Sequence, residues 1–91
     1  MKRENVVSPG EILSEEFLKP AGISEGRLAL DSGVSATQIN EIISGSRAIT
    51  EETALRLGAY FGVEPEFWRN LQARFDRLTA RNAASDAVSN A

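Results

Sequence analysis

A group of polar residues near the middle of the chain combines side chains that suit contact with nucleic-acid bases. Thr37, Gln38 and Asn40 are close together, and Ala36 precedes them. Gln and Asn amides can pair bidentately with adenine, while Thr and Ala can contact the thymine methyl group. On a helix these residues are predicted to read base edges in a DNA major groove. The alternative is a solvated polar face in which Gln38 only supports a helix cap.

Residues beside this group are predicted to contact DNA phosphates. The candidates are Arg27, Ser35, Ser46, Arg47 and Thr50. Hydroxyl groups, backbone N–H groups and an Arg near a helix N-terminus are typical phosphate ligands. Arg47 is the strongest of the candidates, and Arg27 is a weaker one. The alternative interpretation of residues 45–50 is an ordinary capped loop.

Two short helices must position these side chains. The spacing predicts one helix from Ser24 to about Ser32 and another over 36–44, separated by Gly33. Ser24 and Ser35 are the predicted N-caps of these two helices. A helix-turn-helix needs a small residue where its helices cross, a residue that tolerates positive φ in the turn, and apolar anchors. Ala29 and Gly33 meet the first two demands. The anchors would be Leu28, Val34, Ile39 and Ile42.

Further capping signals surround this pair. Ser8 and Pro9 predict the start of a first helix, which Pro20 and Gly22 should end. Thr50 followed by acidic residues predicts another helix, and Pro65 opens a last helix that should fade near residue 80.

The resulting prediction is an all-α, compact five-helix bundle with three parts. Residues 1–7 would be a flexible arm, residues 8–80 the helix-turn-helix domain with a C-terminal dimerisation helix, and residues 81–91 a frayed tail.

The last predicted helix carries an apolar stripe with two interpretations. Phe67, Trp68, Leu71 and Phe75 are all large and apolar. They would either close the core of one chain or supply part of a two-fold dimer surface. Phe67 and Trp68 are adjacent and must point in different directions, so one of them is expected outside the core. We expect a mixed role, because two paired DNA half-sites require a dimer.

Composition argues against several functional classes. The 91-residue chain has no Cys and no His, which removes Cys/His zinc sites and the commonest catalytic dyads and triads. No catalytic residue, metal site or cofactor is therefore expected. Apolar stretches are too short for a membrane span, so we expect a cytoplasmic protein. The net charge of −3 leaves no strongly basic segment. DNA binding would depend on a few placed groups or on two copies.

Three segments together resemble the HigA family of antitoxins, within the lambda-repressor-like (XRE) group. They are PGEILSEEFLKPAGIS at 9–24, GVSATQINEIISGSRAITEETALRLGAYFG at 33–62 and EPEFWRNLQARFD at 64–76. The resemblance implies a homodimer that represses its own operon at a palindromic double-stranded DNA operator. It also implies a HigB-type toxin partner, a ribosome-dependent mRNA endonuclease that the antitoxin neutralises. Members often carry Arg early in the recognition helix where this chain has Ala36, which implies low operator affinity or a different operator.

Two alternatives to an antitoxin remain at this level. One is a stand-alone XRE-type repressor without a toxin, and the other is a protein-interaction module that has lost DNA binding. For the antitoxin, Glu11, Glu15 and Glu16 of the first helix form a hypothetical toxin surface, by charge complementarity to a basic nuclease.

Overall fold

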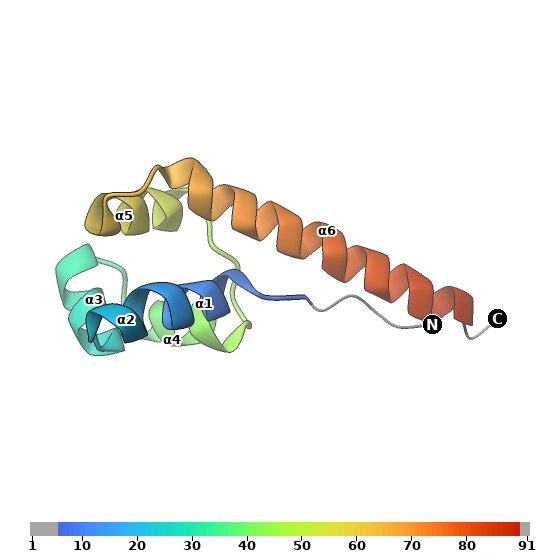
Figure 1. Cartoon of the computed structure of the whole chain (residues 1–91), viewed down its shortest axis with the longest axis horizontal. Coiled ribbons are helices and arrows are strands. Elements are labelled where there is room, and N and C mark those ends of the chain that lie inside the picture. The colour runs from blue at the N-terminus through green and yellow to red at the C-terminus, as the bar shows by residue number, and fades with distance from the viewer. Residues whose placement is uncertain (1–5, 90–91) are drawn as a thin grey trace.

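The computed structural model describes residues 6–89, and the side chains up to Ala83. Helices follow one another along the described chain, with no strand among residues 6–89. Their bounds are α1 Pro9–Ile12, η1 Leu13–Leu18, α2 Lys19–Ala21, α3 Glu25–Ser32, α4 Ala36–Ser44, α5 Glu51–Phe61 and α6 Pro65–Ser89. Because α1, η1 and α2 are continuous, the predicted all-α, five-helix arrangement is confirmed. The last helix, α6, projects well beyond the bundle (Figure 1).

The first helix contains a π-helical turn that the sequence did not predict. Ser8 caps its start, accepting a hydrogen bond from the Glu11 N–H at 3.2 Å. Within η1 the helix widens, and the Lys19 N–H donates to the Ser14 carbonyl, five residues back. The predicted end of the helix at Pro20 and Gly22 is confirmed, since the helix stops at Ala21 with Gly22 as its C-cap, although Pro20 itself still lies inside α2. Proline lacks an N–H and crowds the preceding turn, and a widened turn accommodates both effects.

The caps of α3 and α4 match the sequence prediction. Ser24 Oγ accepts from the Arg27 N–H at 3.1 Å, and Ser35 Oγ accepts from the Gln38 N–H at 3.2 Å. Between the two helices, Gly33 adopts φ +81°, where a side chain would strain the backbone. Local chemistry therefore sets both the start of α4 and the turn before it.

The C-terminal helix is longer than predicted. It begins at Pro65 and continues to Ser89, so the expected end near residue 80 was wrong. The expected fraying of the tail from residue 81 stays a prediction. Residues 81–89 contain several Ala and neither Gly nor Pro, so no residue type there interrupts a helix. Within the predicted arm, residues 6–7 have no regular secondary structure. Residues 1–5 and 90–91 lie outside the described residues.

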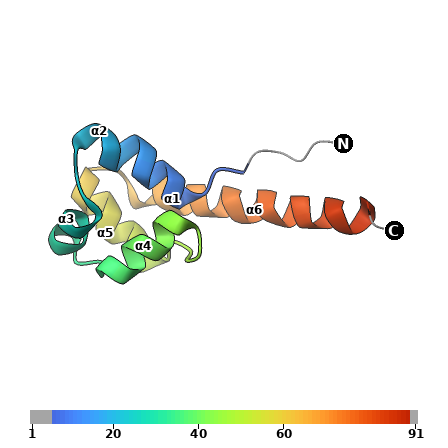
Figure 2. The same cartoon turned by 90° about the horizontal axis from the view of Figure 1, so that it is seen from below.

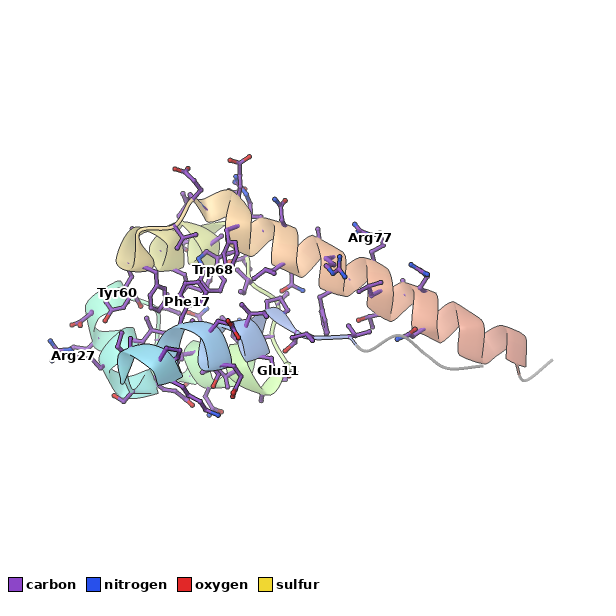
Figure 3. All side chains as sticks on the ribbon, viewed as in Figure 1. Glu11, Phe17, Arg27, Tyr60, Trp68 and Arg77 are labelled. Carbon is purple, nitrogen blue, oxygen red and sulfur yellow. The ribbon has the colours of Figure 1, made fainter. Side chains whose placement is uncertain are left out.

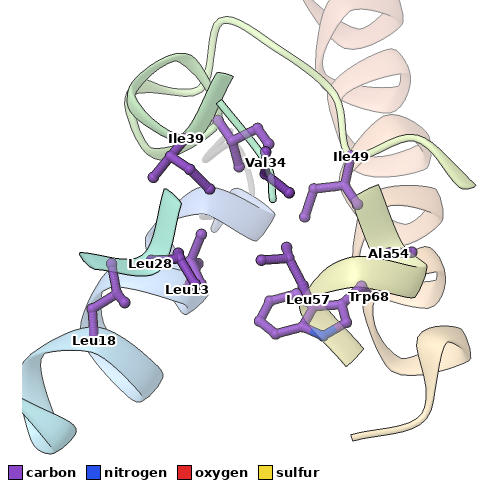
Figure 4. Packing of buried hydrophobic residues seen from close by; sticks show 10 residues of the cluster. Leu13, Leu18, Leu28, Val34, Ile39, Ile49, Ala54, Leu57 and Trp68 are labelled. Carbon is purple, nitrogen blue, oxygen red and sulfur yellow. The ribbon is translucent and has the colours of Figure 1, made fainter. Parts of the chain in front are cut away.

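One apolar cluster joins all the helices of the bundle (Figure 4). The four predicted helix-turn-helix anchors are all buried in it: Leu28, Val34, Ile39 and Ile42. Trp68 is fully buried in it, with ring centroids 4.9 Å from Phe17 and 6.1 Å from Phe61. Its buried indole N–H has no hydrogen-bond acceptor among the described residues, at a cost of about 1–3 kcal/mol. Burying the whole indole offsets that cost.

None of the described helices is both long enough and apolar enough to cross a membrane. The longest, α6, carries charged side chains along its length.

Candidate nucleic-acid interface

The segment α3–turn–α4 forms a helix-turn-helix on one side of the bundle. Figure 2 shows the two helices at an angle, with α1 alongside α4. Leu28 anchors α3, while Ile39 and Ile42 anchor α4, and all three side chains are buried. Ala29 packs half-buried against the same core. With this side of α4 fixed inward, its opposite side must face outward.

The outward face of α4 is polar. Ala36, Thr37 and Asn40 are exposed, as predicted for groups that contact bases, but Gln38 is half-buried. Thr37 lies opposite the anchors Ile39 and Ile42. Further along the same face come Glu41, which is half-buried, and the exposed Ser44. A carboxylate therefore stands at the middle of the surface that would enter a groove.

The amide groups on α4 differ in how firmly they are held. Asn40 Nδ2 donates to Glu25 Oε1 of α3 across 3.5 Å, a long and weak hydrogen bond. Gln38 contributes its backbone N–H to the Ser35 cap. Its side-chain amide makes no hydrogen bond to any described residue. Both amides can therefore turn toward a ligand at little cost.

The predicted phosphate contacts surround the two ends of α4. Ser35 is exposed at its N-terminus, and Ser46 and Thr50 are exposed in the loop after it. The Ser46 hydroxyl lies 3.1 Å from Ser44 Oγ and donates to the Glu41 carbonyl at 3.3 Å. Thr50 Oγ1 accepts from the Thr53 N–H at 3.4 Å, capping α5. All these hydroxyls have structural roles within the chain.

Both predicted arginine contacts are paired with carboxylates. Arg47 Nε lies 2.6 Å from Glu41 Oε1, and Arg27 Nε lies 2.8 Å from Asp31 Oδ2. Tyr60 of α5 also donates to Asp31, at 3.5 Å, and Figure 3 shows Tyr60 and Arg27 at the same end of the bundle. The i,i+4 spacing of Arg27 and Asp31 is visible in the sequence. The Arg47–Glu41 pair was missed, because it depends on how the chain turns after α4.

Comparison with known proteins identifies this arrangement. A helix-turn-helix family profile matches residues 15–68. Antitoxin HigA-1 of Vibrio cholerae is 41% identical over 76 residues, covering 84% of this chain and 71% of that protein. The chain belongs to the HigA-type branch of the helix-turn-helix family.

Two further comparisons extend the match. Virulence-associated protein I of Dichelobacter nodosus is 50% identical over 70 residues, covering 77% of this HigA-type chain. The matched part is 65% of that relative, so the chain spans just under two thirds of its length. The solved structure of Pseudomonas aeruginosa antitoxin HigA with the higBA promoter has a TM-score of 0.86 and 38% identity, and the match covers 94% of each chain.

The structure divides the predicted dimer residues of this HigA-type chain between core and surface. Trp68 is fully buried, so its predicted role as an interface residue was wrong and its indole belongs to the monomer core. Phe67 is 37% exposed, and Leu71 and Phe75 are half-buried. Leu55, which is 51% exposed on α5, was not among the predicted dimer residues. Its position opposite the buried Leu57 stripe was the available signal.

Proposed function

We propose that this chain is an operator-binding antitoxin that represses its own promoter and neutralises a HigB-type toxin. The observation that carries the proposal is the outward polar face of α4, held by a helix-turn-helix whose anchors are buried. The likeness to antitoxin HigA with the higBA promoter supports the choice of DNA as the ligand. No step of this function requires catalysis or a cofactor.

In the proposed complex the N-terminal part of α4 enters the major groove. Thr37, Gln38 and Asn40 contact base edges, with Ala36 packed near them, because these are the outward groups at that end of the helix. Four of the predicted phosphate contacts lie at the two ends of α4: Ser35, Ser46, Arg47 and Thr50. The fifth, Arg27, lies on α3.

The proposed DNA-binding form is a homodimer. Two copies would place their recognition helices about 34 Å apart, one in each half of a palindrome. We assign the contact to the exposed side of Phe67 on α6, together with the accessible parts of Leu71 and Phe75. Solvent-facing aromatic surface of this kind is stabilised by burial against a second chain.

The proposed toxin surface is the acidic outer side of the first helix. Glu11, Glu15 and Glu16 are all exposed. Glu15 pairs with Lys19 at 2.5 Å, whereas Glu11 and Glu16 have no ion-pair partner among the described residues. Such a surface would attract a basic nuclease electrostatically.

Titration of the chain's own promoter DNA tests the first half of the proposal. A labelled promoter duplex should bind more tightly than a scrambled duplex of equal length and composition, and Thr37→Ala with Asn40→Ala should remove that preference. Equal binding of the two duplexes by the unaltered protein would contradict operator recognition. Co-expression with the neighbouring gene tests the second half, with rescue of growth as the supporting result and continued growth arrest as the contrary one.

A further inference from the structure

The Glu41–Arg47 ion pair occupies the surface that would face DNA. Glu41 lies on the outward face of α4, and Arg47 lies in the loop just beyond that helix. Arg47 Nε and Glu41 Oε1 are 2.6 Å apart, and the side chains keep 44% and 38% of their exposure. The pair is therefore accessible to a ligand that approaches α4.

The backbone holds the two side chains together. Gly45 turns the chain at φ +86°, which brings the following residues back over the last turn of α4. The Ser46 N–H donates to the Glu41 carbonyl at 2.9 Å, and the Ser46 hydroxyl donates to the same oxygen. Arg47 thus starts from a backbone position fixed against Glu41. The pairing follows from the turn and needs little additional ordering of side chains.

The same pattern recurs at the neighbouring DNA-contact candidates. Arg27 is paired with Asp31, and Asn40 donates to Glu25. The candidate interface therefore carries a carboxylate beside each of its two arginines, which leaves it nearly neutral. Counterion release from phosphates, which supplies most non-specific DNA affinity, is correspondingly reduced.

We propose that Glu41 limits the DNA affinity of this chain by neutralising Arg47. The inference rests on the proposed function, since it concerns the same DNA-binding face. Only Nε of Arg47 is bonded to Glu41, so its terminal nitrogens can still contact a phosphate. The carboxylate then stands close to that phosphate, and like-charge repulsion opposes the contact. Glu41 thus positions the Arg47 side chain, and its carboxylate repels DNA phosphates at the same site.

The substitution Glu41→Gln separates these two effects. Glutamine keeps an oxygen that can accept the Arg47 Nε–H but carries no charge. Titrations use the full-length protein with labelled promoter and scrambled duplexes over a series of KCl concentrations. E41Q should tighten binding to both duplexes by the same factor, roughly threefold to tenfold at low salt, because phosphate contacts carry no sequence information. The slope of log K against log[salt] should steepen by about 0.9 for each protomer bound.

Two control variants keep the test specific. Glu52→Gln removes the carboxylate of a comparable exposed pair, Glu52–Arg56 at 3.2 Å on α5, and should leave DNA binding unchanged. In an Arg47→Ala background, E41Q should tighten binding by a smaller factor than in the parent, since the neutralised cation is gone and only the repulsion from the carboxylate is relieved. Thermal unfolding checks that each variant is folded.

The outcomes distinguish this inference from the proposed function. Weaker or unchanged binding by folded E41Q would overturn the inference, and so would tightening on one duplex only, because Glu41 would then be reading a base such as cytosine. If the unaltered protein fails to prefer its promoter, operator recognition fails. Equal tightening of both duplexes by E41Q would still support the electrostatic role of Glu41.

Discussion

Gly10 at the start of the first helix is in direct backbone contact with Ile42 of α4. A Cβ atom at position 10 would lie 1.7 Å from the Ile42 carbonyl oxygen and 2.7 Å from the Cα of Ile43. The first helix therefore packs directly on the backbone of α4, the proposed recognition helix. It can approach so closely only because residue 10 has no side chain.

Gly10→Ala should strongly destabilise the fold. The atoms that a methyl group would meet belong to backbone, so α1 and α4 must separate. We expect a loss of about 3 kcal/mol or more in the free energy of unfolding, measured by urea denaturation, because overpacking against backbone cannot relax locally.

Gly26→Ala is the matched control for this prediction. Gly26 lies in α3 with nothing within 4 Å of an added Cβ, so alanine should stabilise the protein by about 0.5 kcal/mol. If the free energy of unfolding of Gly10→Ala, from the same urea measurement, lies within about 1 kcal/mol of that of the parent, the close contact is contradicted.

Base contacts and phosphate contacts on the DNA face should respond differently to substitution. Asn40→Ala should reduce discrimination at one base pair by about 1–3 kcal/mol and leave the salt slope unchanged. Arg47→Ala should weaken binding to all duplexes alike and lower the salt slope by less than about 0.9 per protomer, because Glu41 already offsets part of the Arg47 charge. Both effects are measured by titrating a set of operator duplexes with single base-pair changes. Uniform weakening by Asn40→Ala would remove it from the base-contact group.

Much of this fold was predictable from local sequence patterns, namely helix caps and a glycine turn. Ser24, Ser35 and Thr50 each cap the helix that the sequence assigned to them, and Gly33 makes the predicted turn. These features depend on backbone chemistry within a few residues, which a sequence states directly.

Features that depend on three-dimensional placement were not predictable. Phe67 and Trp68 are adjacent and chemically alike, and only the direction of α6 relative to the core decides which one is buried. The π-turn before Pro20 and the Glu41–Arg47 pair likewise depend on how separate turns meet. The end of α6 was placed too early because its apolar stripe stops at Leu78, whereas a helix that leaves the bundle continues without an apolar face.

The dimer proposal predicts unequal effects at two exposed apolar side chains. Phe67→Ser should raise the monomer–dimer dissociation constant about tenfold or more, since buried aromatic side chains dominate such contacts. Leu55→Ser, on α5, should change it less than about twofold. Sedimentation over a concentration series measures both variants. Because Phe67 also packs on Trp68, at 5.1 Å between ring centroids, thermal unfolding must confirm that the variant is folded. The opposite ranking would move the dimer contact to α5.

The toxin proposal predicts that charge reversal on the first helix weakens antitoxin–toxin binding. Glu15→Lys with Glu16→Lys replaces two exposed carboxylates by cations and turns attraction toward a basic partner into repulsion. We expect at least about a tenfold loss of affinity for the toxin encoded beside this gene, measured by calorimetry. Promoter binding should be unchanged, because neither residue lies in α3, in α4 or in the loop after α4.

The matched control reverses charge at another exposed acidic pair. Glu64 directly precedes α6 and Glu66 lies in its first turn, and neither has an ion-pair partner among the described residues. Their change to Lys alters net charge by the same amount, so it reports the effect of overall charge alone. Glu15→Lys places a cation one turn before Lys19, at a cost of about 0.5 kcal/mol to the helix, which circular dichroism can verify as minor. If both double variants bind the toxin equally well, the contact lies elsewhere on the chain.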